Sequence, residues 1–148
     1  PKEITFDLNL TPGDPILADE VLLARVFHNI LSNALEAAPA HSRIGIELSA
    51  LPGSASSAPI ARVRVQDQGP GVSPARCRAL RLRGWLGIHA DLEPPLLPGL
   101  GLAICQHILE LHDGAFEIAS LPGEGTTVEV RLPYPERQGP PRNTQSIP

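Results

Sequence analysis

Residues 20–38 carry apolar side chains at intervals of three and four positions, and this pattern constrains the fold more than any other feature of the chain. Such spacing gathers the side chains on one side of an α-helix, which must then bury that side against another layer. Asp19 is a suitable N-cap, and Pro39 ends the segment. The predicted helix therefore runs to about Ala38, with a buried stripe of Leu23, Phe27, Ile30, Leu31, Ala34, Leu35 and Ala38.

Two asparagines, Asn29 and Asn33, lie one turn apart on the same helix, away from its apolar stripe. Side chains four positions apart project together from a helix. Amide oxygens are suitable ligands for a hard cation such as Mg²⁺, and amide nitrogens donate to phosphate oxygens. A solvated helix face explains an isolated pair more simply, so the remaining segments decide between the two interpretations.

Alternating apolar and polar residues predict a sheet around this helix. A second helix is predicted from Leu100 to Leu111, with Gly114 as its cap. Residues 69–98 lack periodicity and are rich in proline and glycine, which indicates a long mobile loop. The predicted strands are 4–10, a short piece at 16–18, 43–51, 60–66, 116–120 and 126–132, and the apolar side of 60–66 is Ala61, Val63 and Val65 or their neighbours.

The composition fits one domain. A chain of 148 residues with 42% hydrophobic content is long enough for one core. A net charge of −4, with no basic run, argues against a nucleic-acid partner. No segment has the length and apolar character of a membrane span or a leader, and Pro1 at the start leads us to expect an excised fragment. Cys77 and Cys105 are expected to be buried small residues rather than metal ligands or a disulfide framework, which fits a reducing compartment.

A glycine-containing turn follows the third long strand, in the sequence Asp67-Gln68-Gly69-Pro70-Gly71. Glycines at alternate positions let the backbone approach a ligand closely. An aspartate at a strand end is positioned to accept a hydrogen bond from an exocyclic amine such as that of adenine. A plain Asp/Gly/Pro turn is the competing explanation.

Two further glycine-rich segments lie in the second half of the chain. Gly99-Leu100-Gly101-Leu102 opens it, where unpaired N–H groups and the helix dipole favour phosphate, although close helix packing explains such glycines equally well. Gly123-Glu124-Gly125-Thr126 joins the last two strands and by itself is a common hairpin turn.

In this order the four segments resemble the histidine kinase, gyrase, MutL and heat-shock chaperone superfamily, and most closely the catalytic domain of two-component sensor histidine kinases. The resemblance covers the chain from about Ile4 to Pro133. It implies an α+β, two-layer sandwich of the Bergerat type: a mixed, mostly antiparallel sheet of about five strands, with about three helices on one face. Residues 1–133 are then one ATP-binding domain, 72–98 its lid, and 134–148 a disordered tail.

The resemblance also implies roles for individual residues, with ATP and Mg²⁺ as cofactors. Asn33 resembles the magnesium ligand, Asn29 a neighbouring metal or phosphate contact, and Asp67 the carboxylate that reads adenine. No residue of the chain is assigned as catalytic, because the amide of Asn29 stands where related ATPases have a glutamate that activates water. The expected nucleotide-binding set is Asn29, Asn33, Asp67, Gly69, Gly71, Gly99, Leu100, Gly101, Leu102 and Thr126.

The lid segment departs from the kinase pattern. It contains Trp85 but no lysine and no Phe-rich run, and Leu97 stands where the glycine run commonly begins. Its arginines at 76, 78, 81 and 83 could meet phosphate or a partner, or form a solvated run. A degenerate interaction module that keeps the fold and has lost phosphotransfer is therefore an alternative, and an anti-sigma-type serine kinase is a further one.

None of the five histidines has the sequence context of a phosphoacceptor. The resemblance therefore implies that the substrate histidine lies on a separate dimerisation segment of the parent, which forms a homodimer and passes the phosphoryl group to a response regulator. The chain alone is not expected to phosphorylate itself. A cytoplasmic location without direct membrane contact is expected, and the parent could be membrane-anchored.

Overall fold

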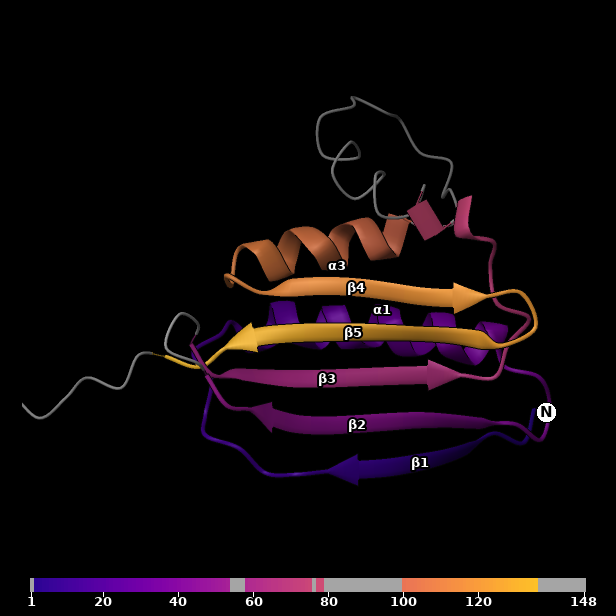
Figure 1. The fold of residues 1–148 in the computed structure, drawn as a ribbon, viewed down its shortest axis with the longest axis horizontal. Coiled ribbons are helices and arrows are strands. Elements are labelled where there is room, and N and C mark those ends of the chain that lie inside the picture. The colour runs from indigo at the N-terminus through magenta and orange to yellow at the C-terminus, as the bar shows by residue number, and fades with distance from the viewer. Residues whose placement is uncertain (1, 54–57, 76, 79–99, 136–148) are drawn as a thin grey trace, which may run out of the picture.

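The computed structural model describes residues 2–53, 58–75, 77–78 and 100–135. They form a two-layer α+β domain in which one sheet carries both described helices on the same face (Figure 1). This confirms the predicted fold class, with two helices in the described residues where about three were expected. The elements are β1 (Thr5–Leu10), α1 (Glu20–Ala37), β2 (Arg43–Leu51), β3 (Ile60–Asp67), α3 (Leu100–Glu110), β4 (Ala115–Leu121) and β5 (Gly125–Pro133).

The sheet is mixed, with the strand order β1-β2-β3-β5-β4. Strand β1 runs parallel to β2, and every other neighbouring pair is antiparallel. The hairpin predicted for the last two strands is present as β4–β5, and β2 and β3 form a second antiparallel pair. The short strand expected at 16–18 is wrong: these residues connect β1 to α1 without regular structure.

Helix α1 begins and ends where the sequence predicted. The Asp19 side chain accepts a hydrogen bond from the N–H of Leu22 at 2.9 Å, and Ala38 is the C-cap. The buried stripe is shifted slightly from the expected one. Val26 is fully buried, whereas Leu35 is 38% exposed. Because a helix turns 100° per residue, the apolar positions of α1 cover a wider arc than the side that contacts the sheet. Apolar side chains at the edge of that arc stay exposed.

The core lies between the two helices and the inner face of the sheet. Cys105 and Leu109 of α3 pack in the same buried cluster as Ile30 of α1 and Val130 of β5. Helix α3 ends at Glu110 and is followed by a turn in which Asp113, with a φ of 52°, lies in the left-handed region, and the N–H of Gly114 donates to the Leu109 carbonyl at 2.8 Å. The left-handed cap is therefore Asp113 rather than the predicted Gly114.

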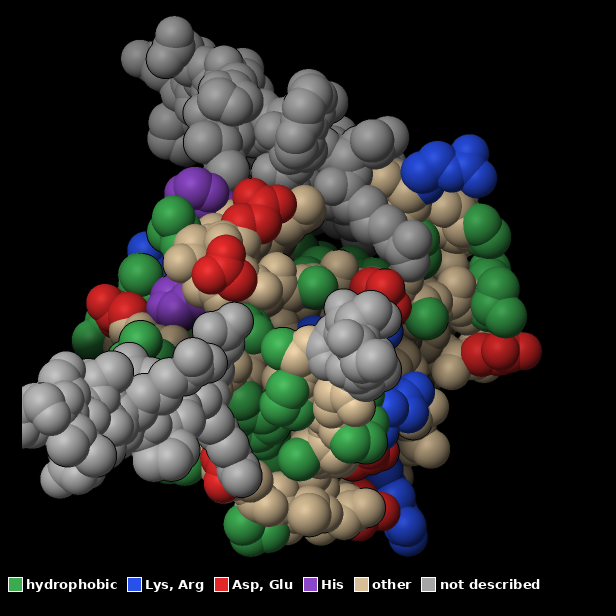
Figure 2. All heavy atoms as spheres, turned by 60° about the vertical axis from the view of Figure 1, so that its left-hand side comes forward, with side chains coloured by type: hydrophobic (Ala, Val, Ile, Leu, Met, Phe, Trp, Pro, Cys, Tyr) green, Lys and Arg blue, Asp and Glu red, His purple; other side chains and the backbone are tan. Residues whose placement is uncertain are grey.

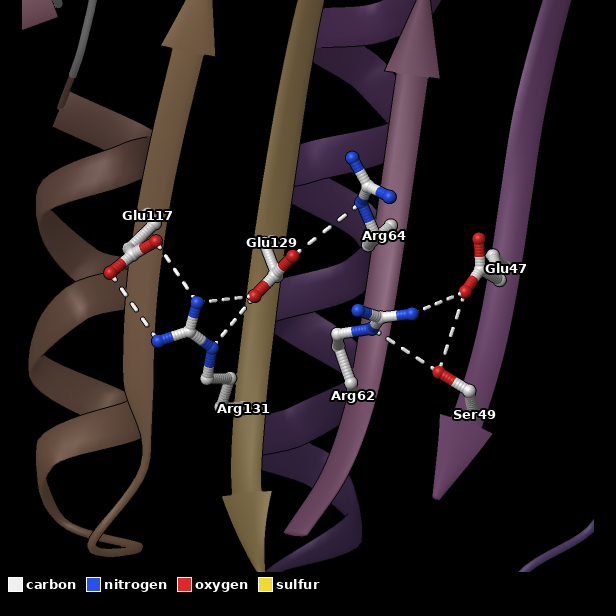
Figure 3. Close-up of polar contacts among 7 residues, drawn as sticks. All are labelled: Glu47, Ser49, Arg62, Arg64, Glu117, Glu129 and Arg131. Carbon is white, nitrogen blue, oxygen red and sulfur yellow. Dashed lines mark hydrogen bonds and ion pairs between the residues drawn. The ribbon is translucent and has the colours of Figure 1, made fainter. Parts of the chain in front are cut away.

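Ion pairs cover the outer face of the sheet (Figure 3). Arg131 of β5 contacts Glu129 at 2.6 Å and Glu117 at 3.1 Å, and Arg62 of β3 contacts Glu47 at 2.6 Å. Acidic and basic side chains lie next to one another on the right-hand side of Figure 2, where neither sign forms a large patch. Polar residues therefore alternate with the buried ones along the strands, as expected for a sheet with one solvated face.

Both cysteines are buried as expected, with Cys105 fully enclosed and Cys77 8% exposed. Neither forms a disulfide, and the described residues contain no cluster of His, Cys, Asp and Glu suited to a metal ion. Within the same part of the chain, neither helix combines the length and the apolar composition needed to span a bilayer.

Candidate nucleotide-binding site

The predicted site segments meet at one end of the sheet, on the right in Figure 1. The end of β3 lies there beside the β4–β5 turn and the C-terminal half of α1, with the first turn of α3 above. Register pairs Asp67 of β3 with Thr126 of β5, and α1 packs against α3. Site residues separated by up to 72 positions in the sequence are therefore neighbours in space.

Asn29 connects the two helices. Its amide nitrogen donates to the carbonyl of Gly101 at 3.3 Å and also hydrogen-bonds the buried thiol of Cys105. The thiol in turn contacts the carbonyl of Val26 at 3.5 Å, and burial raises the pKa of Cys105 to about 11, so the sulfur stays protonated at neutral pH. Because the amide nitrogen has two partners on α3, the Asn29 side chain has a defined orientation.

Asn33 lies one turn further along α1 and is exposed. An exposed amide carries an oxygen that a hard cation can approach without any rearrangement of the core. The two amides thus supply neutral oxygen ligands. Mg²⁺ can bind such oxygens together with phosphate oxygens and water. The residues present therefore fit a magnesium ion held jointly by protein and nucleotide.

Asp67 is the most enclosed charged residue of the described chain, with 5% of its surface exposed. Its Oδ1 accepts the N–H of Gly69 at 2.8 Å, and the carboxylate also accepts a backbone N–H from Thr126. Burial raises the pKa of Asp67 above its ordinary value, and these backbone hydrogen bonds oppose that shift. The carboxylate is consequently held in a fixed direction at the end of β3.

The turn after Asp67 is built on backbone geometry that requires glycine. Gly71 has a φ of 65°, and a β-carbon there would overlap the carbonyl oxygen of Leu121. At Gly69 a β-carbon would lie 2.9 Å from the carbonyl oxygen of Ala37 on α1. These glycines therefore let the turn pack against α1 on one side and against the β4–β5 hairpin on the other.

The hairpin is fastened to this turn by two hydrogen bonds. The N–H of Gly123 donates to the Pro70 carbonyl at 2.8 Å, and the N–H of Val72 donates to Ser120 Oγ at 2.8 Å. Ser120 also contacts Thr126, with 3.0 Å between the two hydroxyl oxygens. Ser120 was absent from the predicted site, because a single serine in a strand carries no motif. Only its position opposite Thr126 in the register of β4 and β5 indicates that Ser120 belongs to the site.

The phosphate side is described in part. Leu100 is the first residue of α3, and Gly101 and Leu102 follow within its first turn, facing α1 through the contact of Gly101 with Asn29. A β-carbon at Gly101 would lie 3.5 Å from the Asn29 side chain, which is ordinary contact. Gly99, most of the predicted lid and residues 136–148 of the predicted tail lie outside the described residues.

Fold and site together define an α+β nucleotide-binding domain with helices on one face of a mixed sheet. A family model agrees. The model for histidine kinase-, DNA gyrase B- and HSP90-like ATPases matches residues 18–136, so the chain belongs to that family. The proteins to which it is similar include sensor histidine kinases.

Among curated proteins, the chain is 34% identical over 137 residues to the histidine-protein kinase/phosphatase MprB of Mycobacterium sp. (strain KMS), covering 89% of the chain and 25% of MprB. It is 31% identical over 135 residues to the C4-dicarboxylate transport sensor protein DctS of Rhodobacter capsulatus, covering 87% of the chain and 18% of DctS. The chain therefore spans only about a quarter or less of the length of these two relatives.

Solved structures give the same result. A mycobacterial sensor histidine kinase MprB superposes with a TM-score of 0.68 at 26% identity, covering 88% of this chain and 81% of that one. Full-length ShkA in complex with AMPPNP superposes with a TM-score of 0.67 at 26% identity, covering 88% of this chain and 26% of ShkA. The predicted family and fold are thus confirmed.

Proposed function

We propose that this domain binds ATP with Mg²⁺ and supplies the γ-phosphoryl group to a histidine on a separate dimerisation segment of its parent protein. The observations that carry the proposal are the pairing of Asp67 with Thr126 at the end of β3 and the hydrogen bond from Asn29 of α1 to Gly101 of α3. The four residues come from four different elements. Membership of the ATPase family supports the same conclusion.

On the phosphate side, Asn33 would hold the magnesium ion and Asn29 would contact the metal or phosphate. Magnesium, when bound, neutralises charge on the phosphates. The oriented amide of Asn29 and the first turn of α3 favour a negatively charged ligand between the two helices, because the start of a helix attracts anions. The chain contributes positioning and charge complementarity rather than a nucleophile of its own.

On the base side, Asp67 would accept a hydrogen bond from the exocyclic amine of adenine. The backbone bonds from Gly69 and Thr126 fix the direction of its carboxylate. Gly69 and Gly71 keep the turn free of side chains, and Thr126 closes this side of the site from the last hairpin. The role of Asp67 is thus recognition of the base rather than acid–base chemistry.

The partners follow from this chemistry. A phosphoryl donor needs an acceptor, and we place the acceptor histidine in the parent, with homodimerisation through that segment and a response regulator as the next acceptor. A cytoplasmic setting supplies ATP. The relatives are much longer than the matched region, which leaves room for such segments in their chains.

Calorimetry of the 148-residue chain with AMPPNP, with and without Mg²⁺, tests the nucleotide and the metal together. We expect binding in the micromolar to millimolar range that tightens with Mg²⁺. Asn33→Ala should remove the tightening by Mg²⁺, whereas Arg43→Gln, an exposed charge change at the start of β2, should keep it. No heat of binding at millimolar AMPPNP would refute the proposal. Equal Mg²⁺ dependence in Asn33→Ala would refute the metal assignment alone.

A further inference from the structure

The hydroxyl of Ser120 has three hydrogen-bonding neighbours at the base side of the site. Ser120 Oγ donates to the Gly125 carbonyl at 2.7 Å and accepts the N–H of Val72 at 2.8 Å. The third neighbour is Thr126 Oγ1 at 3.0 Å. A serine hydroxyl has one hydrogen to donate and two lone pairs. The three contacts therefore use its full capacity.

This count fixes the direction of the hydrogen between the two hydroxyls. The only hydrogen of Ser120 is given to the Gly125 carbonyl, which cannot donate in return. The contact between Ser120 and Thr126 must then be made by the hydrogen of Thr126. As a result, Thr126 Oγ1 presents lone pairs only to any other group that approaches it.

The neighbouring carboxylate presents the same polarity. Asp67 pairs with Thr126 across β3 and β5, and an ionised carboxylate is likewise acceptor-only. An edge made only of acceptors suits the amino group at position 6 of adenine, which donates. It does not suit the oxygen at the same position of guanine, which only accepts, because two facing acceptors would be left desolvated and unpaired.

We infer that Ser120 is a positioning residue that holds the Thr126 hydroxyl as an acceptor and thereby makes the base side of the nucleotide site selective for adenine. The inference rests on the proposed nucleotide function. It adds that the selectivity is set in part by a residue one strand away from the base. By holding the N–H of Val72, the same hydroxyl also fixes the residue that follows the glycine turn.

An isosteric pair of variants isolates the hydroxyl. Ser120→Thr keeps the hydroxyl and Ser120→Val replaces it with a methyl group of similar size. We would measure affinities of each for AMPPNP and GMPPNP with Mg²⁺. The ratio of the two affinities should fall about fivefold to tenfold in Ser120→Val, since one net hydrogen bond is worth about 1 kcal/mol. Ser120→Thr should restore it.

A control distinguishes selectivity from general loosening. Ser49 is a strand serine of the same sheet that hydrogen-bonds Arg62 on the outer face, away from the site. Ser49→Val should leave the ratio of affinities unchanged. A uniform loss of both nucleotides in Ser120→Val, with the ratio preserved, would overturn the inference and leave the proposed function standing. If the parent chain binds neither nucleotide, the proposed function itself fails.

A second measurement covers the case in which Ser120→Val unfolds. Ser120→Ala removes the hydroxyl with a smaller change of shape. Amide hydrogen exchange at Val72 should then be about tenfold faster than in the parent chain, because its acceptor is lost. The ratio of AMPPNP to GMPPNP affinity should fall as in Ser120→Val. An unchanged exchange rate together with an unchanged ratio would contradict the positioning role.

Discussion

The two sides of the site are built in different ways. On the base side, Asp67, the turn at Gly69 and Gly71, Ser120 and Thr126 are joined by hydrogen bonds of 2.7 to 3.0 Å. On the phosphate side, Asn29 reaches Gly101 through a longer bond of 3.3 Å, and Asn33 is exposed.

This difference indicates which part of the site exists before the ligand arrives. Groups that are fixed by their neighbours lose little entropy on binding, and this favours selective recognition. Under the proposed function, the amides would gain their remaining partners from the metal and the phosphates. The base side would then define which nucleotide binds, and the nucleotide would complete the phosphate side.

The largest effect is expected from Gly71→Ala on the base side. Its φ of 65° and the overlap with the Leu121 carbonyl should cost about 3 kcal/mol of the free energy of unfolding. Urea denaturation measures this. The control is Gly45→Ala on β2, where a β-carbon meets nothing within 4 Å, so the stability should change by less than about 1 kcal/mol. Equal effects at both glycines would show that the turn is not rigid.

The asparagines should separate stability from binding on the phosphate side. Asn29→Ala removes the bond to Gly101 and should cost about 1 kcal/mol of the free energy of unfolding. Asn33→Ala should cost less than about 0.5 kcal/mol, because Asn33 is exposed. Both should weaken binding of Mg-AMPPNP in calorimetry. A stability loss at Asn33 as large as that at Asn29 would mean that both amides are structural.

The stability contributed by Asp67 should depend on pH in the direction opposite to that of a paired surface carboxylate. Burial raises its pKa in the folded state, so the charged form costs stability at neutral pH, and this cost disappears as the group is protonated. The stability of the parent relative to Asp67→Asn should therefore rise as pH falls from 7 through the raised pKa. The gain is complete below the ordinary value of 3.8. A pH-independent difference would argue against the buried charge.

The smallest effect is expected on the outer face of the sheet. Arg62→Gln removes the ion pair between Arg62, which is 24% exposed, and Glu47, which is 35% exposed. This should lower the free energy of unfolding by about 0.5 kcal/mol. The affinity for Mg-AMPPNP should stay the same, because this face lies across the sheet from the helices. A marked loss of affinity would mean that the outer face communicates with the site.

Much of the fold was predictable because single elements carry their own signals. The periodicity of residues 20–38 and the Asp19 cap gave α1 its bounds, and alternation gave β2 with no error. The failures have local causes. Residues 16–18 are apolar but have no strand partner, and Asp113 adopts the left-handed cap that glycine usually occupies.

The site was predictable where a motif repeats a known order and not where a contact depends on register. Asp67 and Thr126 came from motifs and are now seen as cross-strand partners. Their proposed roles in binding remain predictions. Ser120 was not found, because its importance depends on β4 pairing with β5 and on the turn after Asp67 folding back against both. No local sequence pattern predicts a contact between these three segments.

The sequence by itself determined the elements, the family resemblance and the residue types that suit a nucleotide, because helix periodicity, strand alternation and glycine turns are local properties. Only the tertiary structure decided how the hydroxyls and amides are oriented. The inferred donor direction between Thr126 and Ser120 depends on the other contacts of Ser120, and the amide nitrogen of Asn29 points to Gly101 of α3. The physical reason is that a hydrogen bond is directional and saturable, so the polarity of each group depends on neighbours that are distant in the chain.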